Sequence, residues 1–393
     1  MIKILFKPFV WLFGEGFPLM LKDWRFWLLL FAINTSGNLG LYYYISEPIS
    51  LILITVILLF SFKPFDKKEN LYVIGFATVY FLQCIILTRY QLVTTLHHYQ
   101  QIVVAIMLAK CLGANFFKYF SSIIILYAII SLVCFALQWN GFVIPYTAAE
   151  VASDGDDYVR VSNLYYTQLG NGTGLAREFL RNCGPFWEPG AYQGFLNLSL
   201  FYLIITFSSF TKQWCTKIAI LVVTIITTFS TGGYIAFFVN VCIFLYINKG
   251  LSGIFKVVLA LVFAFISYYY YTTLAFMQEK ITGDQGRMGF SFEGIDDIGN
   301  LILGYGYDVE SFSKSSLYKA GSIVSTFNYT GLVGGIILFI GMILNRCQYR
   351  LFYFVIMFVI LMNEPFLVNS FIFWGLPFVI FPLIDKGNNH KVS

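Results

Sequence analysis

The residues best suited to chemistry lie together near the middle of the chain, in the stretch RNCGPFWEPGAYQGF at positions 181–195. Arg181 opens this stretch, and Glu188 stands directly before Pro189 and a long apolar run. A guanidinium is a planar, bidentate donor for phosphate, and a carboxylate can take a proton from a hydroxyl group. The pattern predicts a site for an anionic substrate at the edge of an apolar segment, with Glu188 as general base.

The same stretch also has a structural interpretation, which the sequence leaves open. Proline is favoured at the first helical position and a carboxylate just before a helix is stabilised by the helix dipole, so Glu188 is alternatively a cap. Trp187 and Tyr192 are either anchors at the membrane interface or platforms that stack on sugar rings. Cys183 is expected to be a small packing residue.

The composition indicates that a membrane-embedded scaffold positions these residues. Hydrophobic residues make up 58% of the 393, and charged residues only 11%. The mean hydropathy is +0.74. These values exclude an ordinary soluble domain and predict a polytopic all-α membrane protein. The net charge of +5 reports basic residues in cytoplasmic loops and does not suggest a nucleic-acid partner.

A helix needs about 20 mostly apolar residues to span a bilayer. By this criterion we expect about twelve spans within a single membrane domain, residues 1–393. The expected spans are roughly 26–44, 46–62, 71–88, 99–113, 116–139, 190–209, 216–230, 231–248, 255–276, 321–344, 351–366 and 367–384. Residues 1–24 are expected to lie along the cytoplasmic interface, with Trp11 at headgroup level.

Twelve spans place both termini on one side, together with the short connections. That side carries 17 of the 25 Lys and Arg residues, so the positive-inside rule makes it the cytoplasm. Two long polar connections, about 140–189 and 277–320, then face the periplasm. Long loops are often functional, so we expect the chemistry in these two.

The basic residues on the predicted outer face are mostly arginine. Five arginines stand there against three lysines, whereas lysine dominates the inner face. Because arginine grips phosphate in a bidentate manner, this bias predicts an anionic ligand outside, with ordinary ion pairing as the alternative. The five arginines are Arg89, Arg160, Arg177, Arg181 and Arg287.

Other groups that could carry chemistry are weaker candidates. Asp296 and Asp297 form a pair in the second loop, but no third ligand stands at metal-binding spacing, so no metal is predicted. His97 and His98 fall at an outer helix end and are expected to be interfacial rather than catalytic.

Four motifs, in this order, resemble the O-antigen polymerase (Wzy) and O-antigen ligase superfamily. The first is the Arg-x-x-Gly-x-Phe-x-Glu-Pro element from Arg181 to Pro189. The second is the Ser-Thr-Gly-Gly-Tyr element at 230–234, and the third pairs Arg287 with the Leu-Gly-Tyr-Gly stretch at 303–306, which contains Tyr305. The fourth is Ser-Thr-Phe-Asn at 325–328, which ends on Asn328 and precedes Gly-Leu-Val-Gly at 331–334.

The resemblance implies a glycosyltransferase of the bacterial inner membrane whose active site faces the periplasm. Its donor and acceptor would be oligosaccharide repeat units on undecaprenyl pyrophosphate, and it would need neither metal nor cofactor. The growing glycan would move to the non-reducing-end hydroxyl of another lipid-linked unit, with a separate chain-length regulator as partner. Arg181 and Arg287 match the family's outer-loop arginines, which hold the pyrophosphate, and Glu188 matches its glutamate.

Other functions remain open at this point. Ligases typically carry a histidine in the second large loop, and this chain has none there, which favours a polymerase over a ligase. A flippase for lipid-linked oligosaccharides would predict charged residues inside helices and short outer loops, and Lys110 is the nearest case of such a charge. A structural or regulatory membrane protein is a third alternative, and the two polar loops argue against it only mildly.

Overall fold

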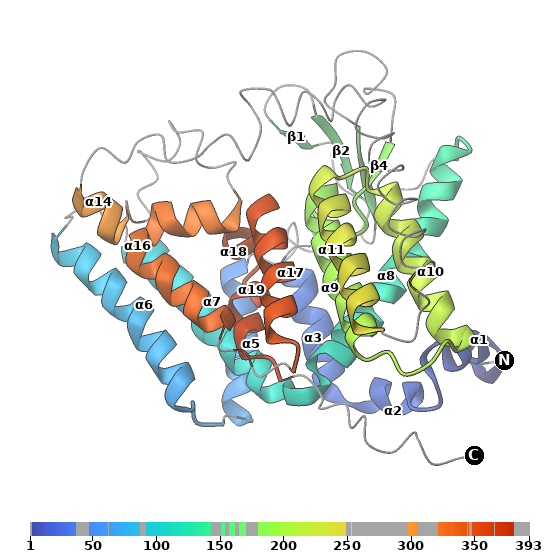
Figure 1. Cartoon of the computed structure of the whole chain (residues 1–393), viewed down its shortest axis with the longest axis horizontal. Coiled ribbons are helices and arrows are strands. Elements are labelled where there is room, and N and C mark those ends of the chain that lie inside the picture. Colours follow the sequence, from blue (N-terminus) through green and yellow to red (C-terminus); the bar gives the residue numbers. More distant parts are fainter. Residues whose placement is uncertain are drawn as a thin grey trace.

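The structure of the chain is a computed structural model. It describes residues 2–36, 47–61, 63–86, 92–142, 151–153, 157–161, 165–169, 180–248, 253, 298–304, 306, 321–343, 345, 348–364 and 366–380. These residues are mostly helical, as the sequence predicts, and they include one small sheet that it does not predict. Figure 1 shows the sheet at one end of a helical bundle, with α1 and α2 at the opposite end.

The helices follow the apolar runs of the sequence. Their bounds are α1 Ile2–Phe13, α2 Phe17–Lys22, α3 Trp24–Thr35, α5 Glu47–Phe60, α6 Lys67–Ile86, α7 Leu92–Leu112, α8 Phe116–Trp139, α9 Pro189–Ile205, α10 Lys212–Thr227, α11 Thr231–Ile247, α14 Ile298–Leu303, α16 Ser322–Ile343, α17 Arg350–Asn363, α18 Phe366–Asn369 and α19 Ile372–Gly375. Short 3-10 turns occupy η1 Gly113–Asn115 and η4 Leu376–Phe378.

Three helical segments of the described chain are long and apolar enough to cross a membrane. They are Lys67–Ile86, the continuous stretch Leu92–Trp139 that holds α7, η1 and α8, and Ser322–Ile343. Three shorter helices are also apolar, namely Glu47–Phe60, Thr231–Ile247 and Arg350–Asn363. A helix advances 1.5 Å per residue, so the shorter ones fall below the 30 Å of a typical hydrocarbon core.

The last expected span, 367–384, is not a single helix. Within its described part, α18, α19 and η4 are short pieces, and the chain is extended at Val379. The breaks have a local cause, since Ser370 and Pro377 interrupt the apolar run and proline cannot continue a helix. The expected span 255–276 lies outside the described residues.

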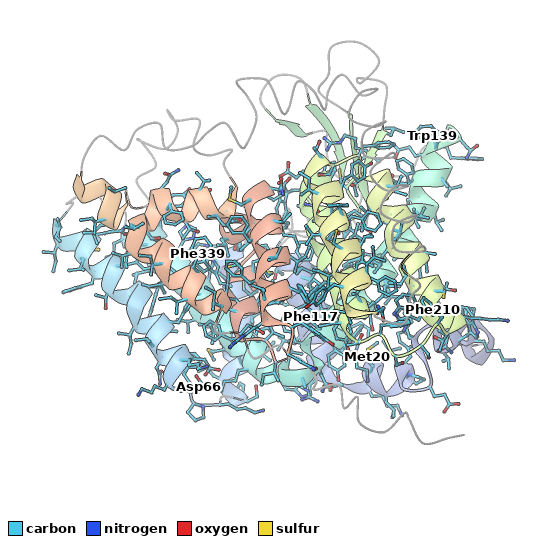
Figure 2. The ribbon with its side chains drawn as sticks, viewed as in Figure 1. Met20, Asp66, Phe117, Trp139, Phe210 and Phe339 are labelled. Carbon is cyan, nitrogen blue, oxygen red and sulfur yellow. The ribbon has the colours of Figure 1, made fainter. Side chains whose placement is uncertain are left out.

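The connections between helices gather at two ends. Figure 2 shows Met20, Asp66 and Phe210 at the end opposite the sheet, and Trp139 beside the sheet. Asp66 and Phe210 belong to connections that the sequence assigns to the cytoplasm, and Trp139 ends the helix that leads into the first predicted outer loop. Asp66 and Phe210 therefore lie at the opposite end of the bundle from Trp139.

Asp23 fixes the start of α3 at the end opposite the sheet. Its carboxylate accepts a hydrogen bond of 3.0 Å from the Arg25 backbone and forms a 2.6 Å ion pair with the Arg25 guanidinium. The hydrogen-bonded guanidinium holds the pKa of the Asp23 carboxyl well below its usual range. The pair lies next to two exposed tryptophans, Trp24 and Trp27, as expected near a membrane interface.

A four-stranded antiparallel sheet occupies the first predicted outer loop. Its strands are β1 Val151–Ser153, β2 Asp157–Val161, β3 Tyr166–Leu169 and β4 Leu180–Asn182, in the order β1-β2-β3-β4. Gln138 at the end of α8 donates a 2.9 Å hydrogen bond to the Thr167 hydroxyl, which ties β3 to the bundle. The sheet thereby holds β4, and the chain leaving it, directly above the start of α9 (Figure 1).

Candidate functional site

Arg181 lies in β4 and reaches the turn between α10 and α11. Its backbone pairs with Gln168 in β3. Its guanidinium donates hydrogen bonds to the carbonyl oxygens of Thr228, at 3.4 Å, and Phe229, at 3.3 Å. Both are longer than the usual distance of about 2.9–3.0 Å, so they hold the guanidinium loosely. Arg181 thus connects the first family-like motif to the turn before the second.

Asn182 anchors β4 in the bundle. Its fully buried side chain donates hydrogen bonds to Ser131 of α8, at 3.3 Å, and to Thr227 of α10, at 3.0 Å. Its Oδ1 accepts one from the Gly184 amide at 2.9 Å. Gly184 has φ +55°, and a Cβ there would lie 2.6 Å from the Tyr192 ring. Only glycine fits this turn, which directs the chain from β4 into α9.

Glu188 occupies the N-cap position of α9, with Pro189 as the first helical residue. Its backbone is extended, with φ −156° and ψ 160°, but its side chain does not cap the helix. The carboxylate instead accepts a 3.0 Å hydrogen bond from the indole of Trp187. Both side chains are partly buried and partly exposed. Trp187 thus orients Glu188, which is half-buried at the start of α9.

Tyr192 has a different place from the one expected. Its ring is fully buried, its hydroxyl shares a 2.9 Å hydrogen bond with Ser131, and Phe186 lies against it at 5.5 Å between ring centroids. No face of the ring is left for a sugar or for the membrane interface. The structure gives Tyr192 a packing role, because the helix turns it towards α8.

A second carboxylate, Glu364, lies beside the first turn of α9. The side chain is 5% exposed, and its Oε1 fills the place that a Cβ on Gly190 would take. The N-terminus of a helix carries a partial positive charge, which stabilises a buried carboxylate there. Glu364 is therefore the anion in contact with the start of α9, while Glu188 points its carboxylate to Trp187.

Ser322 fixes the backbone of Glu364 and joins it to α16. The carbonyl oxygen of Glu364 accepts hydrogen bonds from the Ser322 amide, at 2.9 Å, and from the Ser322 hydroxyl, at 2.6 Å. The hydroxyl oxygen in turn accepts a 3.0 Å bond from the Leu367 amide. The start of α16, the end of α17 and the start of α9 thus meet at Glu364.

The N-termini of α9 and α11 pack side by side near this point. A Cβ on Gly233 would lie 2.8 Å from the Gln193 side chain, and one on Gly232 would lie 2.6 Å from Asn363. Further along, buried Asn197 donates to the Gly233 carbonyl at 3.2 Å and Asn240 donates to the Asn197 carbonyl at 3.1 Å. Small residues and amide hydrogen bonds of this kind let membrane helices approach closely.

Among the residues that the structure describes, the buried polar atoms without a hydrogen-bond partner include three in α9, α11 and α16. These three are Gln193 Nε2 in α9, Thr231 Oγ1 in α11 and Asn328 Nδ2 in α16. Leaving such a group unpaired costs about 1–3 kcal/mol, so these atoms mark where a polar ligand would gain most. Asn328 is the candidate from the fourth motif, and it is 3% exposed.

The third and fourth motifs also meet. Gly331 bends α16, with φ +64° and ψ −167°, and a Cβ there would overlap the carbonyl oxygen of Ile302. The Gly306 amide donates a 3.1 Å hydrogen bond to the Tyr329 carbonyl, and Gln83 of α6 donates to the same carbonyl at 2.6 Å. The motifs therefore form two pairs in space, and Glu364 with Ser322 lies between the pairs.

The other predicted arginines are only partly placed. Arg160 stands in β2, opposite Thr167 of β3. Arg89, Arg177, Arg287 and Tyr305 lie outside the described residues. Among the charged residues predicted for the site, Arg181 and Glu188 are the two whose side chains the structure places.

The two adjacent histidines form a separate polar group between α5 and α7. His97 Nε2 lies 3.8 Å from the Glu47 carboxylate, and Gln101 donates to that carboxylate at 2.7 Å. Gln101 also contacts buried His98 at 2.9 Å. Within the described ranges, no three His, Cys, Asp or Glu side chains are arranged to hold a metal ion.

Glu364 was missed because its segment reads as a boundary between two apolar runs. One signal could have found it. The dipeptide Glu-Pro occurs three times, at 47–48, 188–189 and 364–365, and each time it precedes an apolar segment. The structure brings the second and third of these glutamates to the same helix start.

No protein-family model matches the chain, and neither the curated proteins nor the solved structures include a significant match to it.

Proposed function

We propose that the chain polymerises lipid-linked oligosaccharide repeat units at the periplasmic face of the bacterial inner membrane. The growing glycan moves from undecaprenyl pyrophosphate to the non-reducing-end hydroxyl of another undecaprenyl-pyrophosphate-linked unit. The product is an O-antigen or a related surface polysaccharide. A separate chain-length regulator is the expected protein partner.

The observation that carries this proposal is the grouping of Arg181, Glu188 and Glu364 at the sheet end of an apolar bundle. Such charges are costly near a membrane and are retained there for function. Arg181 and Glu188 come from the sheet and the N-cap of α9, and Glu364 comes from the end of α17. A phosphate-gripping cation and two carboxylates at the same end of the helices suit a substrate that has both a pyrophosphate and a reactive hydroxyl.

The proposed step balances as a simple displacement at the sugar. Glu188 accepts the proton of the acceptor hydroxyl, and the hydroxyl oxygen bonds to the anomeric carbon of the donor. The bond between that carbon and the pyrophosphate oxygen breaks, and the electron pair leaves with the lipid pyrophosphate. Arg181 stabilises the charge that develops on this leaving group. Glu364 acts as a positioning residue, because it contacts the first turn of α9, the helix that directly follows Glu188.

Lys110 bears on the flippase alternative. It forms an ion pair with Glu69. Glu69 lies in the first turn of α6 and Lys110 in the last turn of α7, away from the sheet end. A neutralised pair at one end of the helices is a weaker indication of a substrate pathway than a charge near the middle of the membrane.

Deletion of the gene in its native host tests the proposal. We expect the lipopolysaccharide ladder to collapse to core with a single repeat unit, and the wild-type gene to restore it. Complementation with Glu188→Gln or Arg181→Ala, each checked for membrane expression, should leave the ladder absent. Glu15→Gln is the matched control, because Glu15 is exposed in the turn between α1 and α2.

Other outcomes would point elsewhere. Loss of every attached unit would favour ligation or transport over polymerisation. An unchanged ladder in the deletion strain would overturn the proposal.

A further inference from the structure

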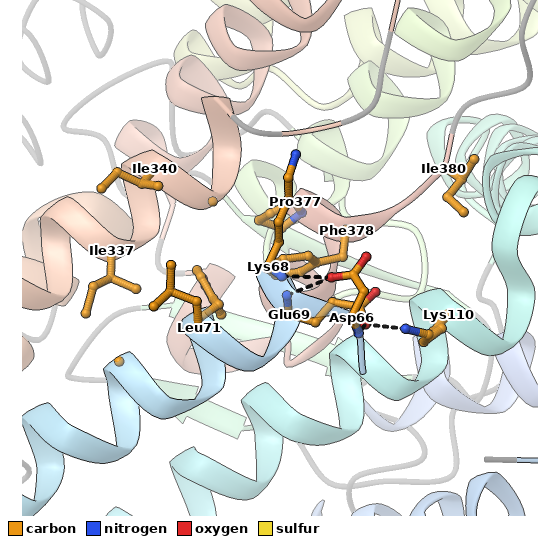
Figure 3. Close-up of a pocket in the computed structure, with 13 residues that line it drawn as sticks. Asp66, Lys68, Glu69, Leu71, Lys110, Ile337, Ile340, Pro377, Phe378 and Ile380 are labelled. Carbon is orange, nitrogen blue, oxygen red and sulfur yellow. Dashed lines mark hydrogen bonds and ion pairs between the residues drawn. The ribbon is translucent and has the colours of Figure 1, made fainter. Parts of the chain in front are cut away.

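A groove lies at the end of the molecule opposite the sheet, away from the proposed polymerase site. It has a volume of about 340 Å³ and is bounded by α6, α16 and the segment 376–380, which contains η4. Most of its wall is apolar, and Figure 3 shows side chains from these three elements around one space. The apolar lining includes Leu71, Gly75, Ile337, Ile340, Phe378 and Ile380.

The groove opens on the lateral surface of the bundle, where hydrocarbon would surround the chain. Leu71 is 68% exposed and Ile340 is 47% exposed, and they lie on the two helices that flank the opening. A volume of this size falls within the range of about 300–1,000 Å³ that is typical of small-molecule pockets. The ligand that reaches it from the side is a lipid chain.

Four charged residues line the groove near the start of α6, namely Asp66, Lys68, Glu69 and, from α7, Lys110. Asp66 Oδ1 accepts hydrogen bonds of 3.0 Å from the backbone amides of Lys68 and Glu69, and the Glu69 carboxylate accepts a 2.7 Å bond from the Asp66 amide. This reciprocal pattern resembles a capping box and fixes both carboxylates in place. Lys110 of α7 pairs with Glu69, as the dashed line in Figure 3 marks.

Lys68 differs from the other three charges. Lys68 is exposed, whereas Glu69 is buried and pairs with the half-buried Lys110. The formal charges of two lysines and two carboxylates add up to zero. They are nevertheless separated in space, because the Lys68 ammonium is exposed and the carboxylates are held by hydrogen bonds. An anionic headgroup would meet the carboxylates as well as Lys68. A zwitterionic headgroup can place its phosphate on Lys68 and its amine towards Asp66.

We propose that this groove binds a zwitterionic phospholipid of the phosphatidylethanolamine type from the inner leaflet. One acyl chain lies along the apolar wall between α6 and α16. The headgroup phosphate contacts the Lys68 ammonium, and the headgroup amine faces the carboxylate of Asp66. The site is independent of the proposed glycan chemistry, and it holds whether or not the chain is a polymerase.

Lipid retention measured by native mass spectrometry tests this proposal. The full chain is placed in nanodiscs that contain equal amounts of phosphatidylethanolamine and phosphatidylglycerol with the same acyl chains, and the lipids that stay bound on ejection are counted. We expect phosphatidylethanolamine to be retained at least severalfold over phosphatidylglycerol. Lys68→Glu should remove this preference. Lys67→Glu is the matched control, because Lys67 is also exposed and makes the same charge change, but does not line the groove.

A second measurement locates the lipid without depending on a variant. Phosphatidylethanolamine with a photoreactive acyl chain should crosslink to peptides that contain Leu71 or Ile337, and unlabelled phosphatidylethanolamine should compete. Equal retention of both lipids, equal effects of Lys67→Glu and Lys68→Glu, or crosslinks elsewhere would each overturn the proposal. Stronger competition by undecaprenyl phosphate would overturn it in favour of a carrier-lipid site.

Discussion

Glu188 and Glu364 have different surroundings although both lie beside the first turn of α9. Glu188 is partly exposed and accepts a hydrogen bond from Trp187, whereas Glu364 is buried against Gly190. A general base must reach the acceptor hydroxyl, so the partly exposed Glu188 suits that role better than the buried Glu364. The buried carboxylate suits the task of holding the helix start in place.

The two glutamates should therefore respond differently to the same substitution. We expect Glu188→Gln to lower the polymerisation rate by about 10²–10⁴-fold, since general-base catalysis contributes that much, and to remove the rise of the rate with pH. Glu364→Gln should lower the rate while leaving the pH profile of the remaining activity unchanged. Initial rates across pH, with Glu15→Gln as control, separate the two roles. A lost pH dependence in Glu364→Gln would exchange the assignments.

The substitution Arg181→Lys tests whether binding of the pyrophosphate needs a planar guanidinium with two parallel donors. A lysine there keeps the charge but cannot donate to the carbonyls of Thr228 and Phe229 while it also grips a phosphate with two parallel bonds. We expect Arg181→Lys to reduce kcat/KM by about 10²–10³-fold, the usual loss for one transition-state donor. Arg350→Lys is the matched control, because Arg350 is exposed at the start of α17. Activity near that of wild type in Arg181→Lys would argue against pyrophosphate binding by this residue.

Among the elements, the sequence predicts the helices better than the segments that position the site. Apolar runs place α5, α8 and α11 well, because a membrane helix must satisfy its backbone hydrogen bonds internally. The sheet was missed because its strands are only three to five residues long within a polar loop. Its attachment depends on Gln138 and Asn182, which form hydrogen bonds with residues distant in the sequence.

The candidate site could also be predicted only in part, and Glu364 is the residue that the sequence did not indicate. Its partner, the backbone of Gly190, lies far away in the sequence, and no local pattern encodes that contact. Glu188 could be identified because its surroundings are local, with Trp187 before it and Pro189 after it. The burial of Tyr192 could not be foreseen, since it depends on which face of α9 turns towards Ser131.

The bend in α16 depends on a glycine, and replacing this glycine should lower the stability of the fold. Gly331 has φ +64° and ψ −167°, a conformation that is almost restricted to glycine, and it lies against the backbone of Ile302. We expect Gly331→Ala to lower the free energy of unfolding by at least about 1–3 kcal/mol. Thermal unfolding of the purified protein in detergent measures this, and Gly16→Ala is the control because a Cβ at Gly16 meets no atom within 4 Å. Equal melting temperatures for the two variants would show that α16 is not strained in this way.

For the whole molecule, the proposed reaction requires that the sheet faces the periplasm and the α1–α2 end faces the cytoplasm. Asp66 and Phe210 lie opposite Trp139 (Figure 2), and the proposed orientation places their end in the cytoplasm. The phospholipid groove and the proposed polymerase site would then face opposite leaflets of the same membrane.

Single cysteines at the two ends test the orientation. In a chain whose seven native cysteines are otherwise replaced, we expect a membrane-impermeant maleimide to label Asn140→Cys on intact spheroplasts. Cys215 retained alone should react only after permeabilisation. Both positions are exposed, at the end of α8 and within the first turn of α10. The reverse labelling pattern would place the sheet in the cytoplasm and remove the proposed reaction.

Polymerisation by the purified protein is the direct test of the proposed polymerase activity. The chain is reconstituted into vesicles with undecaprenyl-pyrophosphate-linked repeat units extracted from the deletion strain, and glycan length is followed by gel and mass spectrometry. We expect lipid-linked chains of two or more units to accumulate with the wild-type protein and not with Glu188→Gln. Vesicles in which the folded wild-type protein leaves every unit single would contradict it.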